Sequence, residues 1–164
     1  MVRCPGFRIV SMFLRFDQVC FEYASMGQPL FEGVNIHFAQ GWTGIVGANG
    51  AGKSTLLRLA IGELEPRRGR VQKPSTALYA PQRTDDPPPH GARFLESTDP
   101  LAGDLRRRLQ LGGDWLSRWP TLSHGERKRL QIGAVLWQEP DLLALDEPTN
   151  HIDADARALL LATL

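Results

Sequence analysis

A glycine-rich segment from Gly47 to Thr55 constrains this chain more than any other part of its sequence. It reads GANGAGKST and matches the pattern G-x-x-x-x-G-K-[ST]. Glycines allow a tight loop whose backbone N–H groups face phosphate oxygens, and a helix that begins near Ser54 adds the positive end of its dipole. We expect Lys53 to neutralise the β- and γ-phosphates and the Ser54 hydroxyl to ligate Mg²⁺. The candidate nucleotide-binding residues are Gly47, Asn49, Gly50, Ala51, Gly52, Lys53, Ser54 and Thr55.

Length and composition exclude several other classes of protein. The 164 residues are 42% hydrophobic and 23% charged, which is typical of one soluble globular domain. The formal net charge of +1 is too small to give the strong positive electrostatic field expected of a dedicated nucleic-acid-binding protein. No apolar run approaches the ~18 residues that a membrane-spanning helix needs. Cys4 and Cys20 form neither a disulfide framework nor a metal motif, so we expect a cytoplasmic protein.

Hydrophobic periodicity predicts strands that alternate with helices. This alternation indicates an α/β fold with a mainly parallel sheet flanked by helices. The expected strands are an alternating pair within 13–38 joined by a turn at 27–33, a buried strand at 43–46, and strands at 77–80 and 142–145. The expected helices are 56–64, stopped by Pro66 and Gly69, then 93–111 and 123–137, with a proline-rich loop at 85–89.

Two acidic residues, Asp146 and Glu147, follow the last apolar strand. An acidic pair at a strand end is by itself more often a solvated loop. Beside a phosphate-binding loop, the carboxylate of Asp146 is suited to hold Mg²⁺, and Glu147 to polarise the attacking water as general base. The upstream glycine-rich loop therefore favours the catalytic interpretation.

A predicted helix start at Ser123 is the third candidate functional feature, after the glycine-rich loop and the acidic pair. Ser123 and Glu126 match the S-x-x-E capping box, in which each side chain satisfies a backbone N–H of the other residue. An ordinary capped helix explains these two residues completely. The free N–H groups at such a helix start also suit an anion.

The order of these segments resembles the ATP-binding cassette (ABC) ATPases. The loop 47–55, the pair Pro81-Gln82, the segment Leu122 to Glu126 and the apolar strand ending in Asp146-Glu147 occur in the family's order. The resemblance covers the chain from Phe13 onward. It implies a P-loop cassette core with an N-terminal antiparallel β subdomain and a small helical subdomain. It also implies ATP and Mg²⁺ as cofactors, and hydrolysis of ATP between two head-to-tail cassettes.

The same resemblance implies roles for residues outside the loop. Tyr23 would stack on adenine, although Phe21 competes for this place and a core aromatic remains the alternative. Gln82 would reach the Mg²⁺ and the attacking water, and would couple to the helical subdomain. Ser123 and Gly125 would contact the γ-phosphate of ATP held by the second cassette. Asp153 would cross the same interface.

The segment after Glu147 indicates which subgroup of the family the chain resembles. Residues 148–153 read PTNHID, a form that looks like the ABC-F group of soluble, duplicated cassettes, many of which act at the ribosome. We therefore expect a second cassette as partner, the ribosome as a further candidate partner, and no integral membrane segment. Two alternatives stay open. One is the ATP-binding subunit of a transporter, and the other is a non-catalytic nucleotide-binding remnant.

Several positions depart from the family pattern. His124 stands where the family usually has glycine. The basic runs 106–108 and 127–129 are expected to be solvated helix faces. Residues 1–12 are expected to be an N-terminal arm or an artefact of start-site choice, with the cassette domain at 13–164. Because the strand that leads to the family's switch histidine is missing, we expect a truncated cassette that is poorly stable and weak as an ATPase.

Overall fold

A computed structural model describes residues 13–25, 27–148, 154, 158 and 162. The chain divides into two compact units, the first ending at Ala77 and the second beginning at Leu78. The expected N-terminal arm at 1–12 and the segment 149–153, with Asp153, lie outside the described residues.

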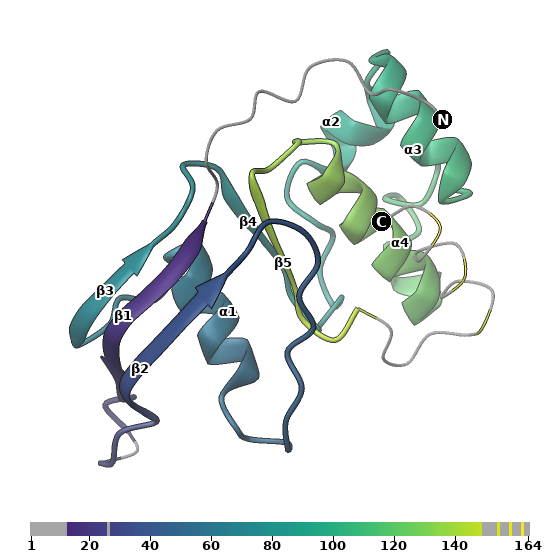
Figure 1. The fold of residues 1–164 in the computed structure, drawn as a ribbon. Helices are drawn as coiled ribbons and strands as arrows, with labels where there is room; N and C mark the ends of the chain where they lie inside the picture. The colour runs from purple at the N-terminus through teal and green to yellow at the C-terminus, as the bar shows by residue number, and fades with distance from the viewer. Residues whose placement is uncertain (1–12, 26, 149–153, 155–157, 159–161, 163–164) are drawn as a thin grey trace. The chain divides into compact units, whose positions relative to one another are not determined.

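The first unit is built on a three-stranded antiparallel sheet (Figure 1). Its strands are β1 (Leu14–Phe21), β2 (Phe31–Phe38) and β3 (Arg68–Gln72), in the order β2-β1-β3. This confirms the predicted antiparallel pair within 13–38. The sequence did not predict β3, because its exposed residues show no apolar alternation.

A bulge in β1 sets which of its side chains are buried. Leu14 and Phe16 alternate inward, but the next buried residues are Val19 and Phe21, one position out of phase. The pairing with β2 shifts between Phe16 and Val19, where Gln18 adopts a φ of 50°. An extra residue in one strand shifts the alternation in this way and strengthens the local twist.

The helix after the glycine-rich loop is α1 (Lys53–Ile61). It begins at Lys53, next to the predicted start near Ser54, and ends at Ile61, before the predicted stop at Pro66. Gly62 has a φ of 80°, and its N–H donates to the carbonyls of Arg58 and Leu59. Glycine is favoured at this left-handed position because it has no Cβ, so Gly62 closes the helix.

The predicted strand at 43–46 is wrong. This segment forms no strand, and Val46 is 94% exposed. A strand exists only through hydrogen bonds to a neighbour. All described strands pair either within β2-β1-β3 or within β4-β5, so an apolar run here lacks the pairing that would make it a strand.

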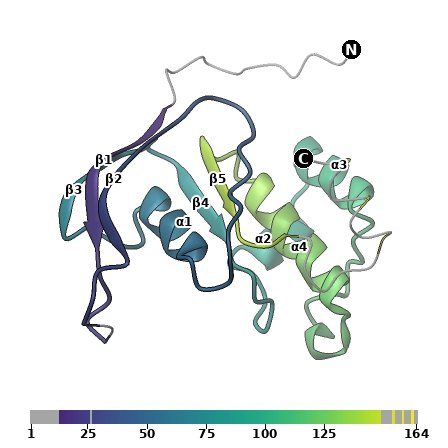
Figure 2. The same ribbon diagram turned by 60° about the horizontal axis from the view of Figure 1, so that its bottom comes forward.

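The second unit combines two short strands with helices (Figure 2). The strands β4 (Ala77–Ala80) and β5 (Leu142–Leu145) lie at their predicted positions and form a two-stranded sheet. The helices are α2 (Gly91–Glu96), α3 (Pro100–Arg108), the short 3₁₀ helix η1 (Trp119–Thr121) and α4 (His124–Leu136).

The single helix predicted at 93–111 is two helices. The chain is extended at Ser97, and α3 begins at Pro100 after Asp99, whose side chain accepts from the Leu101 N–H. Proline disfavours helical backbone in the residue before it but suits the first turn of a helix. Pro100 therefore keeps Asp99 out of helical backbone and starts the second helix.

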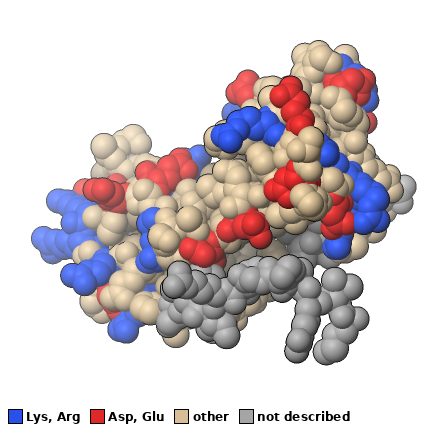
Figure 3. Space-filling model, turned by 90° about the horizontal axis from the view of Figure 1, so that it is seen from above, with Lys and Arg blue, Asp and Glu red and all other residues tan. Residues whose placement is uncertain are grey.

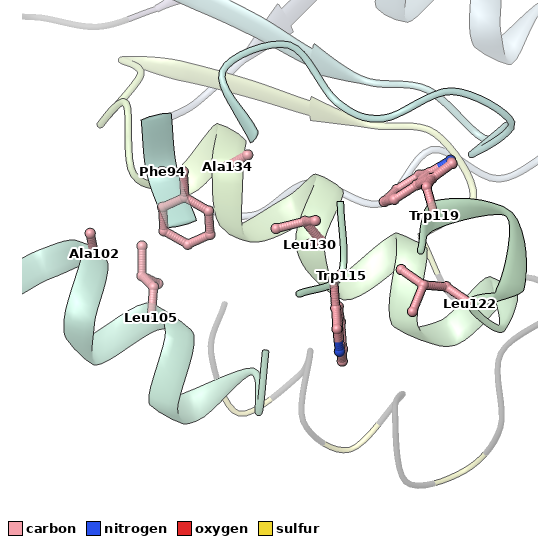
Figure 4. Close-up of a cluster of buried hydrophobic side chains, with 8 residues drawn as sticks. All are labelled: Phe94, Ala102, Leu105, Trp115, Trp119, Leu122, Leu130 and Ala134. Carbon is pink, nitrogen blue, oxygen red and sulfur yellow. The ribbon is translucent and has the colours of Figure 1, made fainter. Parts of the chain in front are cut away.

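An apolar cluster between α2, α3 and α4 forms the core of this unit (Figure 4). Phe94 of α2 faces Leu105 of α3, while Leu130 comes from α4. Such a shared core makes the three helices one packed body. Its buried members are Phe94, Ala102, Leu105, Trp115, Trp119, Leu122, Leu130 and Ala134.

The basic run 106–108 is only partly a solvated face. Arg107 and Arg108 both pair with Asp104 near the surface. Arg106 instead donates to the carbonyls of residues 94, 95 and 97, at the end of α2. It thereby satisfies terminal carbonyls of that helix. Elsewhere, positive and negative side chains are interspersed on the face shown in Figure 3, in keeping with the small net charge.

Candidate nucleotide-binding and catalytic residues

The glycine-rich loop, in the first unit, is exposed and turns sharply into α1. Gly50 and Gly52 have φ values of 79° and 90°, which favour glycine. A Cβ on Gly52 would lie 2.9 Å from the ring of Phe31, so a side chain has no room there. No side chain caps α1, and its first turn holds no acidic residue. The loop therefore keeps a helix N-terminus suited to an anion.

Lys53 lies across this loop. Its ammonium donates to the carbonyls of Gly47 and Ala48, at 2.9 and 3.0 Å. These bonds fold the lysine over the same turn whose N–H groups would face a phosphate. Ser54 is exposed beside it, whereas Thr55 is buried.

Tyr23 reaches the end of the loop from the residues after β1. Its hydroxyl lies 3.0 Å from that of Thr55, and its ring packs edge-on against Phe21 with centroids 4.9 Å apart. The structure thus brings the aromatic candidate and the last residue of the glycine-rich segment together. Sequence spacing gave no signal for this hydroxyl pair.

In the second unit, Asp146 follows β5 and is buried. Tyr79 of β4 donates its hydroxyl to the Asp146 carboxylate at 2.7 Å, and the Asp146 N–H donates to the carbonyl of Ala80. These contacts fix the carboxylate at the strand end. Tyr79 was not predicted as a site residue, because its only signal in the sequence is its position in the strand before Pro81-Gln82.

Gln82 and Glu147, the two candidate catalytic residues, are in contact. The Gln82 amide donates to Oε2 of Glu147 at 2.9 Å. Glu147 has a φ of 44°, a conformation that non-glycine residues rarely adopt and that is frequent at functional sites. The two-stranded sheet β4-β5 brings together the residues that follow each of its strands.

The capping box predicted at Ser123 is confirmed. The Ser123 N–H donates to Oε2 of Glu126 at 2.8 Å, and the Glu126 N–H donates to Oγ of Ser123 at 3.2 Å. The first of these bonds is the main reason that the pKa of Glu126 lies below its usual 4.5. Ser123 and His124 are exposed at the helix start, and Gly125 is buried.

The prediction that 127–129 is a solvated face is wrong. Lys128 is only 3% exposed, and its ammonium donates to the carbonyl of Pro81 at 2.6 Å and to Oε1 of Gln131 at 3.0 Å. Arg127 and Arg129 lie over the rings of Trp119 and Trp115, respectively. Three adjacent charged residues suggested a solvent-exposed helix face. Each of their side chains instead makes a tertiary contact that the local sequence does not reveal.

Most of the chain matches a known protein family. The ABC transporter family matches residues 31–150, more than half of the chain, and this range includes the glycine-rich loop and the Asp146–Glu147 pair. The chain belongs to the ABC transporter family. It is an ATP-binding cassette domain, and membership in this family implies ATP hydrolysis as the reaction.

Curated proteins of this family resemble the chain over most of its length. An uncharacterized ABC transporter ATP-binding protein of Schizosaccharomyces pombe is 35% identical over 93% of the chain and 22% of its own length. The probable ATP-binding protein YheS of Escherichia coli is 38% identical, over 74% of the chain and 21% of its own length. The zinc import ATP-binding protein ZnuC of Paramagnetospirillum magneticum is 40% identical, over 71% and 48%. The chain thus spans about a fifth to a half of these relatives.

Solved structures support the same fold. A bacterial Atm1-family ABC exporter with ATP bound matches with a TM-score of 0.75 at 23% identity, covering 93% of the chain and 32% of that protein. A metal-chelate type ABC transporter matches with a TM-score of 0.69 at 23% identity, covering 94% and 67%. Within the described residues, none of the helices has the length and apolar character needed to cross a membrane.

Proposed function

We propose that residues 13–164 act as an ABC-F-type cassette that binds ATP and hydrolyses it with Mg²⁺. The exposed glycine-rich loop with Lys53 supports binding, and the Gln82–Glu147 contact supports hydrolysis. Backbone N–H groups of the loop would hold the phosphates. Tyr23 would supply the aromatic face for adenine once its ring turns from Phe21.

The metal would be held by Ser54, Gln82 and Asp146. Their hydroxyl, amide and carboxylate oxygens are the hard donors that Mg²⁺ prefers. The fixed, buried carboxylate of Asp146 fits this use, because Tyr79 already holds one of its oxygens in place. When bound, the metal supplies charge neutralisation at the β- and γ-phosphates.

Glu147 is the proposed general base. Its carboxylate would accept a proton from the attacking water as that water's oxygen bonds to the γ-phosphorus, and the bond to the bridging β–γ oxygen breaks to release ADP and phosphate. Gln82, already hydrogen-bonded to Glu147, would orient the same water. In phosphoryl transfer, most of the rate enhancement comes from positioning of the reactants and from electrostatic stabilisation of the transition state.

A second cassette is the proposed partner, in the same parent protein or in a homodimer. Ser123, which is exposed, and Gly125, which is buried, lie at the start of α4, and both would contact the γ-phosphate bound by that cassette. Loss of this phosphate would then open the interface. The sequence at 148–153 supports the ABC-F type, a cytoplasmic location and the ribosome as a candidate partner.

A thermal unfolding scan with and without Mg-ATP tests the proposal. A ligand at a hundred times its Kd adds about 2.7 kcal/mol of stability, which shifts the midpoint visibly. We expect this shift in the natural sequence and in Lys73→Ala, where an exposed lysine of the same unit is removed, but not in Lys53→Ala. Equal shifts in all three proteins would remove the loop as the phosphate site.

A transporter cassette is the second candidate function. The 40% identity to a zinc import ATP-binding protein favours it. This candidate predicts that the parent protein co-purifies with membranes through a membrane-spanning partner. The ABC-F proposal predicts recovery with soluble complexes instead, so fractionation of a tagged parent protein separates the two.

The third candidate is a non-catalytic cassette that binds nucleotide without turnover. His124, which stands where the family usually has glycine in the segment that would contact the γ-phosphate of the second cassette, favours it. This candidate predicts a midpoint shift with Mg-ATP and no phosphate release. Phosphate release that depends on Glu147 would exclude it.

A further inference from the structure

The loop that carries Gln82 is held by side chains of α4 and η1. Five successive backbone carbonyls of this loop, from Pro81 to Asp85, each accept a hydrogen bond from one of these side chains. Lys128 donates to Pro81 (2.6 Å) and Gln82 (3.4 Å), Gln131 to Arg83 (3.1 Å), Arg127 to Thr84 (3.4 Å), and the indole of Trp119 to Asp85 (2.8 Å).

Side chains replace secondary structure along this stretch. Residues 81–85 form neither helix nor strand, so their carbonyls depend on other partners. The donors come from one packed body, because Trp119 and Leu130 share the apolar cluster of α2, α3 and α4. The position of the loop backbone is therefore fixed by the packed helices that carry these donors.

Lys128 is the central donor. It contacts the first two carbonyls, and Gln131 connects its ammonium to the third. Burial lowers the pKa of Lys128 to about 8, while the charge of Asp146 raises it. The ammonium is thus a buried cation whose surroundings are two backbone carbonyls, an amide oxygen and a carboxylate charge.

We propose that Lys128 is a positioning residue for the reaction, which fixes the backbone at Pro81–Gln82 so that the Gln82 amide meets Glu147. Lys128 contacts neither of these side chains and acts through the backbone of the loop. Because Ser123 caps α4, the same helix links the candidate partner-facing end to Gln82. The catalytic meaning of this contact rests on the proposed function of Gln82 and Glu147.

Limited proteolysis tests the positioning without nucleotide or turnover. In Lys128→Met we expect trypsin to cleave after Arg83 about tenfold faster, because local opening of the loop needs fewer broken bonds. Lys128→Arg keeps a charged donor and should restore resistance to cleavage. Lys73→Met, which removes an exposed lysine from the first unit, should leave this cleavage unchanged. Unchanged cleavage after Arg83 in Lys128→Met would overturn the proposal.

A double-mutant cycle tests the consequence for catalysis. If Lys128 acts through Gln82, Lys128→Met should lower kcat about tenfold in the natural sequence but less than about twofold in a Gln82→Ala background, with KM for Mg-ATP unchanged in both. An equal loss in both backgrounds would refute action through Gln82. Should the Met variant fail to fold, Lys128→Gln removes the charge but keeps a polar group and serves in both experiments.

The two experiments separate this inference from the proposed function. If the chain shows no response to Mg-ATP, the ATPase proposal fails, while the proteolysis experiment still decides whether Lys128 holds the loop. If Mg-ATP binds and turns over but cleavage after Arg83 does not depend on Lys128, only the positioning role fails.

Discussion

The side-chain amide of Gln82 donates to the carboxylate of Glu147 across 2.9 Å, joining residues 65 positions apart in the sequence. Gln82 follows β4 and Glu147 follows β5, and the Asp146 N–H continues the pairing of these strands by donating to Ala80. The sheet therefore delivers the candidate base and its orienting amide to one place. Predictions about either residue must treat them as a pair.

Glu147→Gln should keep nucleotide binding and stop hydrolysis. The new amide oxygen can still accept from Gln82, so the local structure persists, but it cannot take a proton from water. Loss of a general base lowers the rate by about 10² to 10⁴. Phosphate release, together with the Mg-ATP shift in unfolding midpoint, measures both properties. Glu65→Gln, an exposed change of the same chemistry, should alter neither, and equal turnover in Glu147→Gln would exclude this residue as the base.

The capping box should stabilise α4 independently of any ligand. Ser123→Ala removes the acceptor for the Glu126 N–H and should cost about 1 kcal/mol of unfolding free energy. Denaturant unfolding of the chain without nucleotide measures this cost. A matched change at half-buried Ser97→Ala, which removes only a hydroxyl bonded to the Asp99 N–H in a loop, should cost less.

Acid should weaken the same cap. The Ser123 N–H holds the pKa of Glu126 below its usual 4.5, so ionised Glu126 contributes stability above that pH. This contribution is lost as the pH falls through the lowered pKa of the folded state. Glu126→Gln should therefore be less stable than the natural sequence near pH 7, and the difference should vanish in acid. If the difference persists at a pH below the lowered pKa of Glu126, or Glu32→Gln behaves alike, charge at the cap is not its cause.

Local patterns in the sequence predicted the elements whose stabilising contacts are local. The cap of α4 needs only Ser123 and Glu126, three positions apart, and both bonds are present. The predicted strand at 43–46 failed because a strand needs a neighbour, and hydrophobicity does not say whether one is there.

Long-range contacts explain what the sequence did not reveal. Lys128 lies between two arginines, and this charged run predicted a solvent-exposed side chain. Lys128 is nevertheless buried, because carbonyls more than forty positions away in the sequence accept its hydrogen bonds. Likewise β3 exists because it pairs with β1, although its first three residues are exposed and carry no apolar side chain.

Val46→Thr should leave stability almost unchanged. The side chain is 94% exposed, so a hydroxyl in place of a methyl group meets water, and surface changes of this kind stay within about 0.5 kcal/mol. Val19→Thr is the matched control, because Val19 is fully buried and the same change should cost roughly 1–3 kcal/mol there. Denaturant midpoints compare the two. A large loss in Val46→Thr would mean that this segment is a buried strand after all.

Gly69→Ala should destabilise the first unit strongly, because Gly69 of β3 faces the bulge in β1. It has a φ of 84°, and a Cβ would lie 2.3 Å from the Gln18 carbonyl oxygen and 2.5 Å from that of Asp17. Those atoms are backbone, so they cannot move aside without breaking the β1–β3 pairing. Gly27→Ala separates the two causes, because Gly27 has a φ of 63° with no atom within 4 Å of its Cβ position.

The left-handed backbone alone should cost Gly27→Ala about 1–2 kcal/mol. Gly69→Ala should add the clash to this cost and exceed it by at least ~1 kcal/mol, which denaturant unfolding of both variants measures. The excess should also be visible as faster amide exchange in β3 and in the facing half of β1, with α4 unaffected. Equal losses in the two variants would mean that backbone strain, and not the approach of the bulge, requires glycine at position 69.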